Sequence, residues 1–138
     1  ISIQEALYTG NVSSLKTELH KLLRESVSYY DTAGENFYHG LVLGLCAAMS
    51  DRYYVTSNRE SGYGRYDIQL MPKEHDFPGI LIELKAMKHC DHLKSLAAEA
   101  LQQIKEQSYT AEMQAKGITN ICKYGVAFSG KDVEICME

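Results

Sequence analysis

The chain has 138 residues, 45% of them hydrophobic and 23% charged, which suits one globular domain with a single core. Its net charge of −4 argues against a protein that holds nucleic acid through a general positive field. No apolar run approaches the roughly eighteen residues of a membrane span, the N-terminus has no signal-peptide pattern, and the cysteines form no CxxC pair. We therefore expect a cytoplasmic protein with free thiols and no membrane partner. Because the chain has no initiator Met, we also expect it to be one domain of a longer protein.

Two amphipathic helices are predicted in the first third of the chain. Apolar residues recur at three- and four-residue spacing over about residues 12–30, and again over about residues 35–49. Residues 31–34 predict a break between the two helices. Glu35 falls at the N-terminal end of the inward face of the second helix, three residues before Tyr38. The simplest role for this acid is a favourable interaction with the helix dipole.

The rest of the chain predicts five strands and one long helix. The third strand has the apolar run Ile80-Leu81-Ile82, which is typical of a central strand buried on both faces. The helix is predicted over about residues 92–116 with Gly117 as its stop, and residues 129–131 join the last two strands in a hairpin. The order α-α-β-β-β-α-β-β indicates a single α/β domain over residues 1–138, with helices packed on a mixed sheet. The predicted strands cover residues 53–57, 65–71, 79–86, 121–128 and 132–137.

Three charged residues lie on strands in positions that a purely structural role explains poorly. Glu83 and Lys85 end the apolar third strand, and their spacing sends both side chains to one face while Leu84 points into the core. Asp67 is a lone acid on the preceding strand, and pairing of the two strands would place it beside Glu83. Two carboxylates about 4 Å apart repel by about 4 kcal/mol at an effective dielectric of about 20. Magnesium or manganese, which prefer hard oxygen ligands, would remove that repulsion.

Several short patterns are compatible with more than one role. An isolated Glu-x-Lys triplet is also typical of a solvent-facing ion pair at a strand end, with Asp67 in an edge turn. His89-Cys90-Asp91-His92 suggests zinc, but no partner ligands follow at suitable spacing. Gly62-Tyr63-Gly64 is too short for a phosphate-binding glycine loop and predicts a hairpin connection.

Asp67 followed by Glu83-Leu84-Lys85 resembles the signature of the PD-(D/E)XK nucleases, with Tyr66 in place of the usual proline. The likeness extends over nearly the whole chain and is similar to one subgroup, the domain at the C-terminus of bacterial proteins that carry an AAA-ATPase-like module. It implies a restriction-endonuclease-like αβββαβ core, with residues 1–33 as a helical extension and an added C-terminal hairpin strand. The similar stretches are residues 35–40, 57–67, 82–85, 100–109 and 123–128.

The resemblance also implies roles for individual positions. Asp67 and Glu83 would bind the metal, together with the backbone carbonyl of Leu84. Glu35 would complete the acidic cluster, often through water. Lys85 would orient or activate the attacking water and stabilise the charge that develops on the phosphate.

Four further positions carry a functional and a structural alternative. Gln103 would point from the long helix toward the metal centre, or it is a polar residue on the flank of that helix. Arg59 and Arg65 are candidates for phosphate contact, or they are solvated at the surface or paired with Glu60. Tyr109 would stack on a base or pack against the sheet.

Together these features predict a nuclease that uses Mg²⁺ or Mn²⁺ and a metal-activated water to hydrolyse DNA phosphodiester bonds. RNA stays open as a substrate, and the sequence says nothing about the oligomeric state. The alternative is a catalytically silent nuclease-like module that serves an ATPase domain in the same protein. The acidic net charge and the missing start of the chain favour this alternative, whereas the complete acid-acid-lysine set favours an enzyme.

Overall fold

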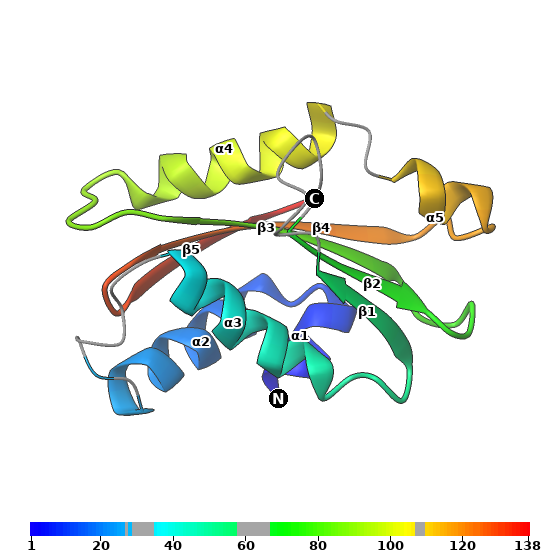
Figure 1. Ribbon diagram of the computed structural model, residues 1–138, viewed down its shortest axis with the longest axis horizontal. Helices are drawn as coiled ribbons and strands as arrows, with labels where there is room; N and C mark the ends of the chain where they lie inside the picture. Colours follow the sequence, from blue (N-terminus) through cyan, green and yellow to red (C-terminus); the bar gives the residue numbers. More distant parts are fainter. Residues whose placement is uncertain (27, 29–34, 58–66, 107–109) are drawn as a thin grey trace.

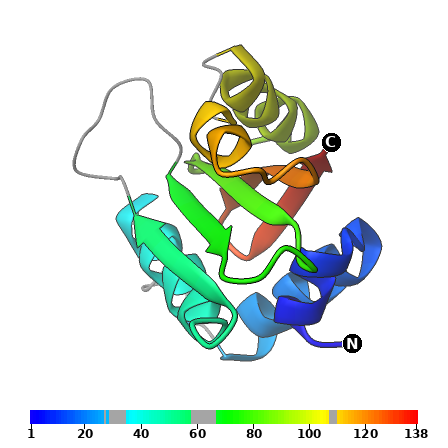
Figure 2. The same cartoon turned by 90° about the vertical axis from the view of Figure 1, so that its right-hand side faces the viewer.

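The computed structural model describes residues 1–26, 28, 35–57, 67–106 and 110–138, which form one five-stranded sheet with helices on both faces (Figure 1). The helices α1, α2 and α3 cover one face, and α4 and α5 cover the other; Figure 2 shows the same two layers from the side. None of the helices in the described ranges is long and apolar enough to cross a membrane. The elements are α1 (Ile3–Thr9), α2 (Val12–Ser26), α3 (Glu35–Ala47), β1 (Tyr53–Ser57), β2 (Ile68–Pro72), β3 (Gly79–Ala86), α4 (Leu93–Glu106), α5 (Ala111–Ala115), β4 (Ile121–Ser129) and β5 (Asp132–Met137).

The strands lie in the sheet in chain order, β1-β2-β3-β4-β5. Each pair of neighbours is antiparallel except β3 and β4, which are parallel. Parallel neighbours need a crossover connection, and α4 and α5 provide it. The predicted mixed α/β fold, with its αβββαβ order and C-terminal hairpin, is therefore confirmed.

The first helix, α1, was not predicted from the sequence. Ser2 caps it, because the Ser2 Oγ accepts a hydrogen bond from the Glu5 N–H at 3.0 Å. Gly10 ends it with a left-handed φ of 73°. A serine at the start and a glycine just past the end are common helix boundaries, so the sequence contained the signal. The helix is only seven residues long, too short for a clear apolar stripe.

The single long helix predicted over residues 92–116 is wrong, because the structure has two helices there, α4 and α5. Ile104 of α4 and Met113 of α5 are buried in the same cluster, which also contains Leu81. Each residue turns a helix by about 100°, so these two side chains would point in opposite directions on one continuous helix. Both can face the sheet only because the helix is interrupted between them.

The larger core lies between the sheet and the helices α1–α3. Tyr38 of α3 stacks on Phe128 of β4 with the ring centroids 4.5 Å apart and an angle of 14° between the ring planes. The Tyr124 hydroxyl of β4 donates a hydrogen bond to the Leu7 carbonyl of α1 at 2.6 Å. Burial raises the pKa of Tyr124, so this hydroxyl keeps its proton and its donor role. Helices α1 and α3 are thus both held against β4.

The opposite face of the sheet has smaller apolar clusters. At Gly125 of β4 the sheet touches the backbone of α4, since a Cβ there would lie 2.3 Å from the Ala97 carbonyl oxygen and 2.4 Å from the Leu101 nitrogen. Glycine is therefore what permits α4 to pack this closely. The buried members of the two clusters are Met71, Leu81, Ile104, Met113 and Ile118, and Leu96, Ala97 and Ala127.

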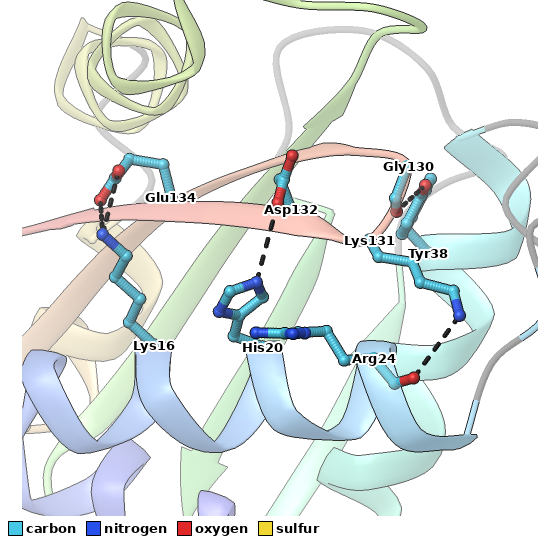
Figure 3. Close-up of polar contacts among 8 residues, drawn as sticks. All are labelled: Lys16, His20, Arg24, Tyr38, Gly130, Lys131, Asp132 and Glu134. Carbon is cyan, nitrogen blue, oxygen red and sulfur yellow. Dashed lines mark hydrogen bonds and ion pairs between the residues drawn. The ribbon is translucent and has the colours of Figure 1, made fainter.

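Polar contacts join α2 to β5, the strand at one edge of the sheet (Figure 3). The Lys16 Nζ lies 3.0 Å from a Glu134 carboxylate oxygen, and His20 Nε2 lies 3.7 Å from Asp132 Oδ1. These side chains are partly or largely exposed, so each pair contributes little to stability. They align the helix with the strand, while the apolar core holds the two together.

Candidate metal and active site

Pairing between β2 and β3 brings Asp67 to Glu83. The regular register joins Gln69 to Leu81 and Ile68 to Ile82. At Asp67 the pattern changes: its N–H donates to the Ile82 carbonyl at 3.1 Å, and its Oδ2 accepts the Leu84 N–H at 2.7 Å. The Asp67 carboxylate therefore lies against the β3 backbone where Glu83 meets Leu84. The predicted pairing of these two strands is confirmed.

The Glu83 and Lys85 side chains leave β3 on the face that α4 and α5 cover. Leu81, two residues before Glu83, packs with Ile104 and Met113 on that face, and side chains alternate along a strand. In the parallel register Glu83 pairs with Gly125, the residue that touches α4. Leu84 points the other way, into the larger core, as predicted.

Both acids are buried: Glu83 is 4% exposed and Asp67 is 8% exposed. The alternative of a solvent-facing ion pair at a strand end is therefore wrong for Glu83, and Asp67 does not lie in an exposed edge turn. Lys85 is half-buried on the same face. A buried carboxylate is stable only when it is hydrogen-bonded, paired with a cation or bound to a metal.

The chemistry of the donor set suits a hard divalent cation. Mg²⁺ is usually held by one or two carboxylates and keeps several of its waters, and two buried carboxylates come from Asp67, just before β2, and Glu83 on β3. No group of three or more His, Cys, Asp or Glu side chains that could hold a metal ion occurs within the described ranges. The two acids alone meet the demand of magnesium, whereas they would not make a four-ligand zinc centre.

The sequence 89–92, considered for zinc, forms a local contact instead. His92 Nδ1 lies 3.0 Å from Asp91 Oδ1, and both residues are exposed. This hydrogen bond to His92 lowers the pKa of Asp91. His89 is exposed with a positive φ of 51°, which is typical of a turn.

Gln103 lies on the flank of α4 that faces β3 and β2. Lys105, two residues later, forms an ion pair at 2.8 Å with Glu138, which follows β5. Two residues turn a helix by about 200°, so Gln103 lies on the side of α4 opposite to Lys105. Gln103 is half-buried on that side. Both the direction of its side chain toward the metal centre and its role stay predictions.

Glu35 is the first residue of α3, and its side chain lies outside the described residues. The backbone of α3 begins at the end of the sheet where the acids lie. Tyr38 packs on Phe128, and His39 Nε2 lies 3.0 Å from the Ser57 Oγ at the end of β1. Because α3 covers the opposite face from Glu83, the backbone alone does not bring Glu35 to the acids, and its role stays a prediction.

The predicted nucleic-acid contacts, Arg59, Arg65 and Tyr109, also lie outside the described residues, as does Gly62-Tyr63-Gly64. These positions remain predictions. The described strands do show where they attach to the fold. In the chain, residues 58–66 stand between β1 and Asp67, and residues 107–109 follow α4.

Two further buried polar residues were not singled out in the sequence. Gln69, at 4% exposed, lies two residues after Asp67 on β2, and its position inside the apolar run Ile68-Gln69-Leu70 was the available signal. His39, at 8% exposed, lies one turn after Glu35 on α3 and contacts Ser57. Its spacing of four residues from Glu35 was the signal in that case.

The sequence profile of the PD-(D/E)XK nuclease superfamily matches residues 33–138. The chain therefore belongs to the PD-(D/E)XK nuclease superfamily, and the site at Asp67, Glu83 and Lys85 lies within the matched region. Comparison with curated proteins and with solved structures finds no match.

Proposed function

We propose that this domain is a metal-dependent nuclease that hydrolyses DNA phosphodiester bonds, with Asp67 and Glu83 holding Mg²⁺ or Mn²⁺. One observation carries the proposal. In a chain of the nuclease superfamily, the buried Asp67 carboxylate accepts the Leu84 N–H next to the buried Glu83 on β3, and Lys85 follows on the face of Glu83. Membership of the superfamily supports nuclease chemistry, while the choice of DNA is the finer part of the proposal.

Each residue has a separate task in this scheme. The bound cation would supply Lewis-acid activation of a water and would offset negative charge on the phosphate. The Leu84 N–H fixes the position of the Asp67 carboxylate, which keeps this acid beside Glu83 as a ligand for the cation. The Leu84 carbonyl and Glu35 are the further oxygen ligands that we propose.

Lys85 is proposed to orient the attacking water and to stabilise charge on the phosphate. Its ammonium group donates hydrogen bonds and carries positive charge, and its half-buried position keeps it near the acids without full desolvation. Gln103 of α4 would donate a hydrogen bond to a water or a phosphate oxygen at the metal site. Arg59 and Arg65 would donate hydrogen bonds to the phosphate backbone, and Tyr109 would stack on a base.

Cleavage of plasmid and linear DNA by the purified chain, in magnesium and in manganese, tests the proposal. We expect cleavage by the wild type and none by an Asp67→Ala/Glu83→Ala double variant. Equal activity of the two proteins would show that any cleavage comes from a contaminant. An RNA of the same sequence, tested in parallel, separates a DNA nuclease from one that prefers RNA.

A catalytically silent module is the second candidate, and the net charge of −4 favours it. In this case the domain would serve an ATPase-like domain of the same bacterial, cytoplasmic protein, and nucleic acid would not be its substrate. A thermal-shift titration separates the two candidates. Stabilisation by millimolar Mg²⁺ or Mn²⁺ supports the nuclease, and a melting temperature that no cation changes supports the silent module.

A further inference from the structure

Gln69 is a buried polar residue in the middle of an otherwise apolar strand. It lies on β2 with Ile68 on one side and Leu70 on the other, and it is 4% exposed. Its Oε1 atom is buried and has no hydrogen-bond partner within the described ranges. Buried amide oxygens are normally satisfied, so an oxygen without a donor points to a group that is bound there in the working protein.

The position of Gln69 places this oxygen beside the acids. Gln69 pairs directly with Leu81, and Leu81 and Glu83 leave β3 on the same face. Gln69 and Glu83 are therefore diagonal neighbours across the two strands, within reach of a long side chain. Asp67 precedes Gln69 by two residues on the same chain segment, and its carboxylate contacts the β3 backbone beside Glu83.

Among the described residues, the surroundings on this face supply no hydrogen-bond donor to the Gln69 Oε1. Thr56, opposite Gln69 on β1, makes no hydrogen bond to this oxygen, the remaining packing around it includes an apolar cluster, and Asp67 and Glu83 are acceptors when they are ionised. The partial negative charge on the Gln69 Oε1 is repelled by the negative charge of the Asp67 and Glu83 carboxylates. A divalent cation, or a water bound to one, is the chemical group that all three oxygens attract. The apolar neighbours are Met71, Leu81, Ile104 and Met113.

We propose that Gln69 supplies a neutral oxygen to the divalent-cation site of Asp67 and Glu83, either to the cation directly or to one of its waters. This inference rests on the proposed metal-dependent function and adds a metal-binding residue to it. A neutral ligand suits this place, because a third buried carboxylate would increase the repulsion in the metal-free protein. If Gln69 contributes this oxygen, the affinity for the cation depends on a residue outside the pattern of Asp67 and Glu83-Leu84-Lys85.

Gln69→Leu tests the inference, because it should change metal-free stability and metal binding in opposite directions. Without metal, the apolar side chain removes a buried oxygen that has no donor, so the melting temperature should rise. With metal, the lost oxygen should weaken the Mn²⁺ or Mg²⁺ affinity by about tenfold, measured by isothermal titration calorimetry on the full chain. Gln102→Leu makes the same exchange on the exposed side of α4 and should leave the affinity unchanged.

Gln69→Glu keeps the size of the side chain and adds a negative charge. It should bind the cation more tightly than the wild type and melt at a lower temperature without it. Equal cation affinity in the wild type, Gln69→Leu and Gln69→Glu would overturn the inference, even if all three bind metal. Absence of cation binding by the wild type would overturn the proposed function as well, so the two failures are distinguishable. DNA cleavage does not enter this test.

Discussion

The two faces of the sheet differ in what they bury. The face under α1–α3 is lined by large apolar and aromatic side chains, and its polar groups, such as the Tyr124 hydroxyl, have partners in the adjoining helices. The face under α4 and α5 has two small apolar clusters and, between them, Asp67, Gln69 and Glu83. Buried charge on the face under α4 and α5 lowers the free energy of unfolding. The apolar packing on the face under α1–α3 must compensate for this loss.

The difference between the two faces explains how a small domain can bury the acids Asp67 and Glu83. The strands are shared by both faces, so packing against α1–α3 holds the backbone that positions Glu83 and Asp67. The close contact at Gly125 then brings α4 down beside Glu83. The face under α4 and α5 can therefore have few apolar contacts and still be well ordered, and variants on the two faces should fail in different ways.

The largest effect should come from Glu83→Gln on the face under α4 and α5. The substitution keeps the side-chain volume and removes a buried charge, so cleavage should fall by at least about 100-fold while stability stays within about 1 kcal/mol or rises. DNA cleavage rates and urea unfolding without metal measure the two quantities. Glu112→Gln on the exposed surface of α5 is the control, with neither property changed. A variant that cuts DNA at the wild-type rate would contradict the assignment of Glu83.

Phe128→Ala should have the opposite profile, because it removes the ring that stacks on Tyr38 in the larger core. We expect a loss of about 3–5 kcal/mol in the free energy of unfolding, measured by urea denaturation. Phe77→Ala is a suitable comparison, since Phe77 is only partly buried and should cost less. A loss below about 1 kcal/mol at Phe128 would mean that this face does not support the fold as described.

Gly125→Ala should disturb the contact between the faces. The new Cβ would meet the backbone of α4 at Ala97 and Leu101, so the helix must shift, at a cost of about 1–3 kcal/mol. Because Gly125 lies beside Glu83, cleavage should fall more than the change in stability alone explains. Gly44→Ala in α3 is the control: its added Cβ would meet nothing within 4 Å, and alanine favours the helix by up to about 1 kcal/mol. Equal stability of the two variants would refute the close approach of α4.

Lys16→Met should have the smallest effect. It removes the exposed ion pair with Glu134 that Figure 3 shows, and the loss should stay below about 1 kcal/mol. Urea unfolding at low and high salt measures it, and the difference from the wild type should shrink as salt rises. A larger loss that salt does not reduce would show that α2 depends on this pair more than on its apolar face.

Much of the fold was predictable because its signals are local. The apolar run of β3, the aromatic and β-branched residues of β1 and the hairpin turn before β5 predicted those three strands with the residue bounds that the structure has. The break between α4 and α5 was not predictable from periodicity, since it follows from where Ile104 and Met113 meet the sheet. Helix α1 was missed because seven residues bury too little to produce a pattern, although Ser2 and Gly10 marked its ends.

The site was predictable in part for a similar reason. Hairpin pairing of two neighbouring strands was enough to bring Asp67 to Glu83. The hydrogen bond from the Leu84 N–H to Asp67 depends on a local departure from regular pairing, which no sequence pattern predicted. Gln69 was overlooked because a single polar residue in a strand is usually on the solvent side, and its burial depends on α4 and α5, which lie later in the chain.

The hydrogen bond from Tyr124 to Leu7 has a consequence for how this domain can be divided. The family match begins at residue 33, yet α1 and α2 contribute Leu7, Leu15, Leu19 and Leu23 to the larger core. Shortening the protein to the matched region would leave a phenol and a broad apolar surface facing water. We therefore expect residues 33–138 to be a unit of shared ancestry that does not fold alone, with the first two helices inside the cooperative unit.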